Sequence, residues 1–300
     1  MTHHAMNRRH FLRQSGAAVA LGAALGPGAA RALAAARAAD IPAEIGIQLW
    51  TVRDVLPGDV NGVLEMLARY GIGEVETAGY ADRDPAAFRD ALAAHGLATP
   101  AAHQLVAELV ADSASMAEAG LPDFDTALET ITTVGHDYFV IPWLPPDARP
   151  DRDGYLRLAD QLNGMGERAN AAGVRLAYHN HDFEFDTFGT DRPAYFDFVE
   201  RLEPDLVTLE LDLYWAVVAG HDPVDIFRRY PGRFPLWHVK DGAGDEMAQT
   251  VVGQGTIDWP RIFAASETAG LRHAFLEADN PPDGSLAFAR DSMAYVDSLR

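Results

Sequence analysis

Residues 176–186 read LAYHNHDFEFD, in which an apolar start is followed by two histidines and three carboxylates within eight positions. Imidazole and carboxylate groups this close together can bind a divalent metal ion or move protons during catalysis. The same residues would also suit a solvated turn that follows a strand. The positions of the other histidines and acids along the chain decide between these two interpretations.

Comparable polar or aromatic side chains end other short apolar segments of the sequence. They are Glu76, His103 with Gln104, Trp143, Asp212, His238 with Lys240, and Glu277. One segment that ends this way would be unremarkable, whereas seven, with the His179 segment included, indicate a shared site. Lys240 is also the only lysine of the chain, although arginine is abundant.

The pattern that must position these residues is an alternation of strands and helices. The predicted strands are 45–50, 75–78, 98–103, 138–141, 174–180, 207–212, 236–239 and 274–277. Amphipathic segments predict helices at 59–70, 85–95, 124–134, 153–172, 192–202, 223–230, 259–269 and 286–299. Eight strands, each followed by a helix, predict a (β/α)8 TIM barrel. A doubly wound sheet is the alternative, but the turn at 50–53 (WTVR) lacks the glycines expected there.

In a TIM barrel, functional side chains lie at the C-terminal ends of the strands. Because side chains alternate between the two faces of a strand, Asp212, His238 and Glu277 are expected to point into the barrel. On the fifth strand His179 and His181 both have inward positions, and alternation permits either as a further ligand. Two imidazoles and two carboxylates predict a site for one divalent metal ion. The alternative is a buried hydrogen-bonded pair of His238 and Asp212 beside a solvated Glu277.

Composition restricts the chemistry further. The chain has no cysteine, which excludes disulfides, thiolate zinc sites, iron–sulfur clusters and cysteine nucleophiles. A metal would bind to His, Asp or Glu, which suits Mn, Co, Mg, Fe or Zn. Beyond the first 39 residues, 19 basic side chains stand against 44 acidic ones, a charge near −25. Such a charge argues against binding to nucleic acid or to an anionic membrane surface.

Residues 1–39 have the features of a twin-arginine export signal. Segment 7–13 reads NRRHFLR, an Ala/Gly-rich segment follows at 16–30, and residues 36–38 (ARA) offer small side chains for cleavage. A transmembrane anchor is the alternative, but the apolar segment is short and contains Pro27. We therefore predict a cleaved signal, a single barrel domain at 40–300, no stable membrane anchor, and a periplasmic or secreted location.

Residues 40–300 resemble the xylose isomerase-like TIM barrel superfamily, the group of the sugar phosphate isomerases and epimerases. The resemblance rests on the segments IGIQLW (45–50), VE (75–76), YHNH (178–181), LD (211–212), HVKD (238–241), GQGTIDW (253–259) and FLE (275–277). The GQGTIDW segment is quite specific, and the others are strong only together. The resemblance implies a barrel that binds one divalent ion at the ends of strands five to eight.

The resemblance also implies a ligand set and a reaction. Members of the superfamily bind the ion through Glu, Asp, His and Glu, and use it to polarise a keto-sugar or keto-polyol. Three of these ligands match Asp212, His238 and Glu277. The strand-five glutamate falls on His179, or on His181 if the loop is shifted; we expect His179 as the ligand and His181 near the substrate. The expected enzyme is a sugar isomerase or epimerase, or a lyase or dehydratase of the same family. Because two-base epimerases need both glutamates, the histidine weakens the two-base scheme and suits chemistry that uses one base and one acid.

The expected catalytic groups are Glu277 as base and His181 or Lys240 as acid, with Lys240 as an alternative oxyanion ligand. The residues expected to contact the substrate are Glu76, His103, Trp143, Glu184 and Trp215, with Trp50 as a further ring for stacking. The predicted substrate is a small keto-sugar, 3-keto-glycoside or cyclitol. It is expected to be unphosphorylated, because no basic cluster suggests a phosphate clamp.

Two other functions remain open. One is a carbohydrate-binding barrel without catalysis, in which the inward side chains only bind sugar hydroxyls. The other is a metal-dependent hydrolase, because endonuclease IV shares this fold. The eight histidines beyond the signal are few for the three zinc ions of that enzyme, and the acidic charge opposes DNA binding. The sequence gives no indication of oligomeric state.

Overall fold

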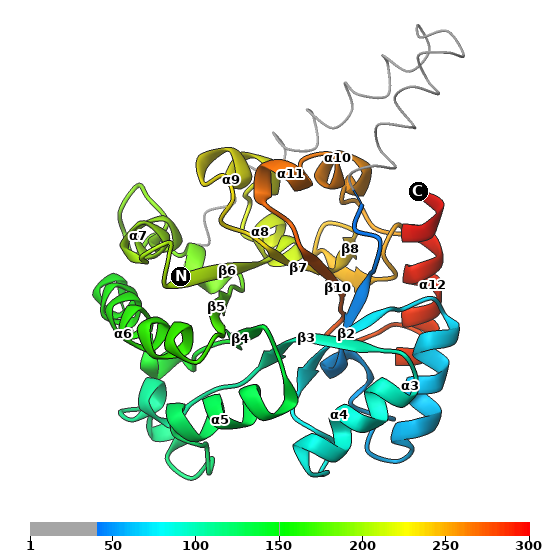
Figure 1. Cartoon of the computed structure of the whole chain (residues 1–300). Helices are drawn as coiled ribbons and strands as arrows, with labels where there is room; N and C mark the ends of the chain where they lie inside the picture. The colour runs from blue at the N-terminus through cyan, green and yellow to red at the C-terminus, as the bar shows by residue number, and fades with distance from the viewer. Residues whose placement is uncertain (1–40, 150) are drawn as a thin grey trace, which may run out of the picture.

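The computed structural model describes residues 41–149 and 151–300. Eight parallel strands close into a barrel in the order β1-β10-β7-β6-β5-β4-β3-β2 (Figure 1). The barrel strands are β1 (Gly46–Gln48), β2 (Glu74–Ala78), β3 (Ala98–His103), β4 (Tyr138–Ile141), β5 (Arg175–His179), β6 (Val207–Asp212), β7 (Leu236–Val239) and β10 (His273–Leu276). Closure of the sheet confirms the predicted (β/α)8 barrel and excludes the doubly wound alternative.

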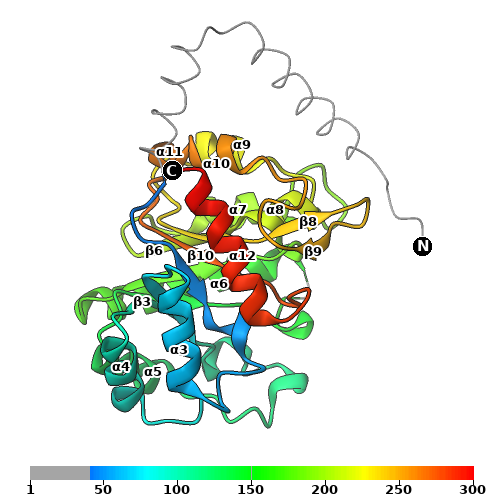
Figure 2. The ribbon, with the colours of Figure 1, turned by 90° about the vertical axis from the view of Figure 1, so that its right-hand side faces the viewer.

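Helices surround the barrel and connect its strands (Figures 1 and 2). They are α3 (Val60–Arg69), α4 (Pro85–Ala94), α5 (Phe124–Val134), α6 (Arg152–Ala171), α7 (Ala194–Arg201), α8 (Leu213–Val218), α9 (Pro223–Arg229), α10 (Trp259–Phe263), α11 (Ser266–Ala269) and α12 (Ser285–Ser298). Many begin with an aspartate whose side chain accepts a hydrogen bond from the first turn, namely Asp59, Asp84, Asp123, Asp151, Asp222 and Asp258. Each such cap contributes about 1 kcal/mol, so helix starts explain part of the acidic composition.

Three features differ from the elements predicted from the sequence. The predicted helix at 259–269 is divided into α10 and α11. Helix α8 follows β6 directly, because the carboxylate of Asp212 ends the strand and caps the helix by accepting a hydrogen bond from Trp215 N. The segment after β7 forms an antiparallel hairpin of β8 (Asp241–Ala243) and β9 (Ala248–Thr250).

Beneath the strand ends, apolar side chains share the barrel interior with the buried carboxylates of Glu76 and Glu210. The five buried apolar side chains are Ala101, Val140, Ala177, Leu236 and Phe275. Four of them lie two positions before a polar residue of the predicted site, so strand alternation places those polar residues in the next layer towards the C-terminal end. Gly46 of β1 lies against Phe275, and a Cβ atom there would be 2.4 Å from Cδ1 of that ring. The close contact requires glycine at this position.

Within the described residues, no helix combines the length and the apolar character that a membrane-spanning helix needs. The predicted export signal, residues 1–39, lies outside the described part of the chain.

Candidate active site

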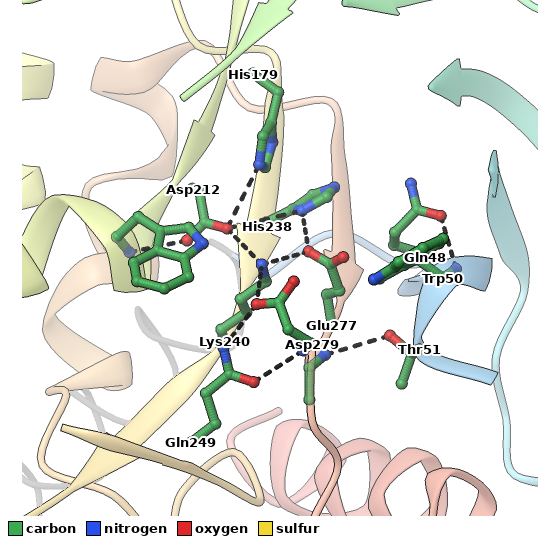
Figure 3. A network of polar contacts seen from close by, with 12 residues as sticks. Gln48, Trp50, Thr51, His179, Asp212, His238, Lys240, Gln249, Glu277 and Asp279 are labelled. Carbon is green, nitrogen blue, oxygen red and sulfur yellow. Dashed lines mark hydrogen bonds and ion pairs between the residues drawn. The ribbon is translucent and has the colours of Figure 1, made fainter. Parts of the chain in front are cut away.

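Lys240 lies among carboxylates at the C-terminal end of the barrel, the mouth (Figure 3). Its Nζ atom is 3.0 Å from Asp212 Oδ2, 2.7 Å from Glu277 Oε2 and 3.1 Å from Asp279 Oδ2. Only 1% of Lys240 is exposed. Burial alone would lower the pKa of the ammonium group, but the three carboxylates outweigh it and raise the pKa well above its ordinary value. Lys240 is therefore a fixed cation and a charged hydrogen-bond donor.

His238 of β7 completes a cluster of charged and polar side chains, the mouth cluster, which consists of His179, Asp212, His238, Lys240, Glu277 and Asp279. Its Nδ1 atom is 2.6 Å from Glu277 Oε2 and 3.8 Å from Asp212 Oδ2. Burial would lower the pKa of His238, but the charges of Glu210 and Glu277 hold it well above its ordinary value. Burial likewise would raise the pKa of Glu277, but Lys240 and His238 outweigh it and lower the pKa. The carboxylates thus stabilise positive charge at this position, and the same surplus of negative charge favours a bound cation.

Glu210 brings a carboxylate into the layer beneath the mouth. It lies two residues before Asp212 on β6, is fully buried, and its Oε2 atom is 3.0 Å from His179 Nδ1 and 2.7 Å from His103 Nε2. Burial raises the pKa of Glu210 to about 7, although the charge of His238 lowers it. The contact at Nδ1 leaves His179 Nε2 on the side of Asp212, whose Oδ2 is 3.7 Å away.

Glu76 of β2 lies in the same deeper layer as Glu210 and contacts the ring of His238. Its Oε2 atom is 2.7 Å from His238 Nε2 and accepts a hydrogen bond of 2.7 Å from Gln48 Nε2. Burial and the charge of Glu210 raise the pKa of Glu76 to about 7. Glu76 and Glu210 therefore orient the rings of His238 and His179, as carboxylates behind metal-binding imidazoles commonly do.

Among the residues that the structure describes, two groups of side chains have ligand atoms close enough for a metal ion. One is Asp212, His238 and Glu277, and the other is His103, His179, Glu210 and His238, with all ligand atoms of a group within 4.8 Å of one another. In the first group Asp212 Oδ2 is buried without a hydrogen bond and lies 3.0 Å from Lys240 Nζ, so this oxygen faces a cation and would also face a metal ion bound there. Burial raises the pKa of Asp212 to about 6, although Lys240 lowers it. These three ligands, with His179 Nε2 as a fourth, are a donor set that suits one divalent ion.

His181 lies just beyond β5, outside both groups. Its ring is parallel to that of Phe183 at 5.0 Å and tilted against that of Trp215 at 5.8 Å. Burial lowers the pKa of His181 to about 3, and its Nδ1 atom is buried without a hydrogen-bond partner. The side chain is therefore a neutral imidazole with one unsatisfied nitrogen, held between two aromatic rings.

Glu184 does not have the position expected of a substrate-binding residue. Its side chain is completely buried, Oε1 accepts a hydrogen bond of 2.8 Å from the Tyr178 hydroxyl, and Oε2 accepts one of 2.7 Å from His181 N. Both oxygens are used within the turn that follows β5. The expectation of substrate contact is therefore corrected, because Glu184 positions His181.

The other residues expected to contact substrate lie at two depths. Glu76 belongs to the deeper layer, and His103 contacts Glu76 and Glu210 from the end of β3, whereas Trp143 follows β4 and is 37% exposed. Trp215 lies in the first turn of α8 and is half-buried, and Trp50, after β1, is 47% exposed. Three indole rings thus follow strand ends at the mouth, where sugar rings can stack.

Two polar residues of the mouth were not among the predicted site residues. Asp279 lies two positions after Glu277, so continued alternation would have placed it on the same face. Gln249 of β9 donates a hydrogen bond of 2.7 Å to Asp279 Oδ2 and accepts one of 2.8 Å from Asp279 N (Figure 3). No pattern in the sequence indicates Gln249, because its position depends on the β8–β9 hairpin.

The GQGTIDW segment has a structural role next to this site. The carboxylate of Asp241 accepts hydrogen bonds from the backbone N–H groups of Gly253, Gly255 and Ile257, and from Trp259 Nε1. A Cβ atom at position 255 would lie 2.0 Å from Asp241 Oδ1, so this position requires glycine. One buried carboxylate therefore closes the loop that carries the hairpin.

Comparison with known proteins gives a consistent family. Residues 64–297 match the family model of the xylose isomerase-like TIM barrel. An inosose dehydratase of Lacticaseibacillus casei is 29% identical over 167 residues, which cover 49% of this chain and 55% of that protein. An inosose dehydratase of Geobacillus kaustophilus is 27% identical over 299 residues, which cover 86% of this chain and 95% of that protein. The chain thus spans about half the length of the first curated relatives that it matches.

Solved structures show the same architecture. A sugar phosphate isomerase/epimerase of Parabacteroides distasonis has a TM-score of 0.70 and 25% identity, and the match covers 84% of this chain and 93% of that one. The IOLI protein, solved with a bound zinc atom, has a TM-score of 0.67 and 16% identity, with coverages of 85% and 97%. At this identity the second likeness concerns the fold alone.

Proposed function

The chain belongs to the xylose isomerase-like TIM barrel family, and we propose that it is a divalent-metal-dependent enzyme that removes a proton next to the carbonyl of a keto-sugar or cyclitol. The observation that carries the proposal is a buried carboxylate paired with a buried ammonium group, Glu277 Oε2 being 2.7 Å from Lys240 Nζ. The similarity to inosose dehydratases and to a sugar phosphate isomerase/epimerase supports this class of substrate. The substrate is unphosphorylated, since the mouth is rich in carboxylates.

The metal ligands in this proposal are His179, Asp212, His238 and Glu277. Bound there, a divalent ion would polarise the substrate carbonyl and make the neighbouring C–H group more acidic. Manganese, cobalt, magnesium, iron or zinc would suit the donors. The zinc atom of the IOLI structure, which has the same fold, is compatible with this assignment.

Glu277 and Lys240 divide the proton transfers between them. Because the pKa of Glu277 is lowered, its carboxylate stays ionised near neutral pH and can accept the proton from carbon. Because the pKa of Lys240 is raised, the ammonium group stays charged and can donate a proton to a leaving oxygen or hold an oxyanion. His181, expected from the sequence as an alternative acid, is a neutral ring here, so its free Nδ1 would instead form a hydrogen bond with a substrate hydroxyl group.

This division favours a dehydratase or lyase over a two-base epimerase. A two-base epimerisation needs a second carboxylate across the substrate, and β5 ends in His179 instead. Burial lowers the pKa of His179 well below its ordinary value, so its ring is neutral and suited to bind a metal. With one base, removal of the proton is followed by loss of a substituent from the next carbon. The half-exposed rings of Trp50, Trp143 and Trp215 would stack on the sugar.

Replacement of Glu277 by Gln tests the proposal. The variant keeps the shape of the side chain, so it should fold, and it should lose exchange of the α-proton with D₂O by about 1,000-fold, since general base catalysis contributes about 100- to 10,000-fold. Exchange is followed by NMR across keto-sugars, 3-keto-glycosides and inososes, with metal content measured in parallel. The control is Glu167→Gln on the exposed surface of α6.

Undiminished exchange in Glu277→Gln would remove Glu277 from the base role. Wild-type protein that lacks stoichiometric metal, and whose sugar binding is unaffected by a chelator, would indicate the carbohydrate-binding barrel without catalysis.

We also propose that residues 1–39 direct export in the folded state. The pair Arg8-Arg9 and the apolar segment after it support this location. Replacement of both arginines by lysine should leave the uncleaved protein in the cytoplasm, which fractionation and mass spectrometry would detect. Normal processing of that variant would contradict the twin-arginine route.

A further inference from the structure

Three imidazole rings and two carboxylates converge beneath the mouth. We call them the inner cluster, which consists of Glu76 of β2, His103 of β3, His179 of β5, Glu210 of β6 and His238 of β7. Glu210 Oε2 lies 2.7 Å from His103 Nε2 and 3.0 Å from His179 Nδ1, and it is 3.2 Å from His238 Nε2. Glu76 Oε2 lies 3.1 Å from His103 Nε2 and 2.7 Å from His238 Nε2. Five strands thus bring three nitrogen and two oxygen atoms together.

The spacing of these atoms is close to that of ligands around one metal ion. Ligand atoms about 2.1 Å from an ion lie about 3.0–3.4 Å from one another at octahedral or tetrahedral angles. The five contacts of the inner cluster range from 2.7 to 3.2 Å, so small side-chain movements would bring the atoms to these separations. The ligand atoms of His103, His179, Glu210 and His238 all lie within 4.8 Å of one another.

Both carboxylates of the inner cluster are buried without a permanent cation. Glu76 and Glu210 have no exposed surface, and the Oε1 atom of each is buried without a hydrogen bond. Along residues 41–149 and 151–300, no lysine or arginine forms an ion pair with either acid, whereas the acids of the mouth share Lys240. Buried charges in proteins are paired or bind a metal ion. A metal ion held by the imidazole rings would neutralise both carboxylates.

The inner cluster uses the ring nitrogens that face away from the mouth. His238 contacts Glu277 through Nδ1 at 2.6 Å and the inner cluster through Nε2. His179 likewise directs Nε2 towards Asp212 (Figure 3) and Nδ1 towards the inner cluster. A neutral imidazole has one lone pair and one N–H group, so a ring that binds an ion through one nitrogen presents an N–H on the other side. An ion in the inner cluster and an ion at the mouth therefore compete for the same two rings.

We propose that the inner cluster is a second metal site, which binds Zn²⁺ in competition with the site at the mouth. This inference goes beyond the proposed function, because the two ligand sets share only His179 and His238. The inner cluster adds a third imidazole, His103, and the carboxylates of Glu76 and Glu210. Three imidazoles suit zinc, copper or nickel, whereas sites rich in carboxylates suit magnesium and manganese.

The identity of the ion then decides which site is used. Affinity for nitrogen-rich sites rises from Mn²⁺ to Zn²⁺, so Mn²⁺ binds at the mouth and Zn²⁺ binds in the inner cluster. Because the inner ion holds both shared rings, Zn²⁺ should displace Mn²⁺ from the mouth. The proposed reaction needs an ion at the mouth, so bound Zn²⁺ should inhibit turnover that Mn²⁺ supports.

The test removes the ring that belongs to the inner cluster alone. His103 pairs with Glu76 and Glu210, and His103→Phe keeps a ring of similar size. Calorimetric titration of the full-length protein should show that the variant loses Zn²⁺ affinity at least about 100-fold, since loss of a partner behind a ligand already costs about 10- to 100-fold. Its Mn²⁺ affinity and its circular dichroism should stay close to those of the wild type. His95→Phe, which removes an imidazole at the end of α4, is the control and should keep both affinities.

Diffraction at the zinc edge separates this inference from the proposed function. In crystals of the wild type with Zn²⁺, the anomalous peak should lie about 2.1 Å from His103 Nε2. A peak bound by Asp212 and Glu277 instead, or wild-type Zn²⁺ affinity in His103→Phe, would overturn the inference and leave the mouth ligands in place. Asp212→Asn should weaken Mn²⁺ binding and keep the zinc peak. Zinc in the inner cluster, with Mn²⁺ binding unaffected by Asp212→Asn, would retain the inference and reject the mouth ligands.

Discussion

The end of β5 with the turn that follows it (178–186) and the loop after β7 (240–259) each combine a buried carboxylate with a side chain that projects into the mouth. In the turn, Glu184 accepts hydrogen bonds from Tyr178 and His181. In the loop, Asp241 accepts four backbone N–H groups and one indole N–H. The two acids stay inside their own segments, whereas His179 and Lys240 take part in the mouth cluster.

The difference between the segments lies in how much depends on each acid. Glu184 fixes a few residues around His181. Asp241 fixes the loop that carries the β8–β9 hairpin, from which Gln249 reaches Asp279. Glu184 and Asp241 thus act on the site only through the residues that they hold in place. Because Asp241 accepts more hydrogen bonds than Glu184, its replacement is expected to have the larger effect on stability.

The largest effect is expected for Asp241→Ala. The substitution leaves several buried donors without an acceptor, and each unsatisfied group costs about 1–3 kcal/mol, so the free energy of unfolding should fall by about 4 kcal/mol. Urea denaturation measures the loss. Asp258→Ala, which removes one helix cap from the same loop, is the control and should cost about 1 kcal/mol. Equal losses in the two variants would mean that Asp241 does not organise the loop.

The next effect distinguishes the two histidines of the turn. Loss of a partner behind a metal ligand costs about 10- to 100-fold in affinity, so loss of the ligand itself in His179→Ala should weaken metal binding at least about 100-fold. His181→Ala should bind the metal nearly as the wild type does, because His181 lies outside both ligand groups. Calorimetric titration with Mn²⁺ and Zn²⁺ gives the affinities. The reverse order would assign the strand-five ligand to His181.

A smaller effect is expected for Lys240→Arg. The charge remains, but a guanidinium group does not release a proton near neutral pH and is too broad for the space between three carboxylates. Turnover should fall about 10- to 100-fold, since general acid catalysis contributes at least that much. Steady-state kinetics at constant metal occupancy provide the measurement. Full activity would leave Lys240 as a counter-charge to the acidic mouth.

The smallest effect concerns Glu184 and pH. Burial raises the pKa of Glu184 from 4.5 to about 7, so between these values the folded protein binds its proton more tightly than the unfolded chain does. The free energy of unfolding should therefore fall as pH rises from about 5 to 7. Glu184→Gln should reduce that fall by roughly 1 kcal/mol, measured by thermal denaturation at several pH values. An unchanged pH profile would show that Glu184 is ionised in the folded protein.

The sequence predicts the fold well because the barrel repeats one pattern eight times. The strand at 207–212 alternates apolar side chains with the inward residues Thr208, Glu210 and Asp212, and many helices begin with an aspartate cap. Strand alternation alone predicts that the side chains of Asp212, His238 and Glu277 point into the barrel. Their roles as metal ligands stay predictions.

Side chains beyond the regular strands are less predictable. Glu184 was expected to face the substrate, but the short 3-10 turn at Phe183–Phe185 directs it back towards Tyr178. Gln249 depends on a hairpin of two three-residue strands, which is too short to leave a periodic pattern. The layer of the barrel in which the Glu210 side chain lies depends on how β6 is aligned with β5 and β7, and a single sequence does not reveal this alignment.

Lys240 also makes the chain suited to a direct measurement of local opening. A protease that cleaves only after lysine has a single site here, and in the folded protein that site is buried beneath three carboxylates. Cleavage therefore requires the strand end to open first, and its rate reports the population of that opened form when reclosing is fast. Protection by metal or by a sugar would register as slower appearance of two fragments, without any knowledge of the natural substrate.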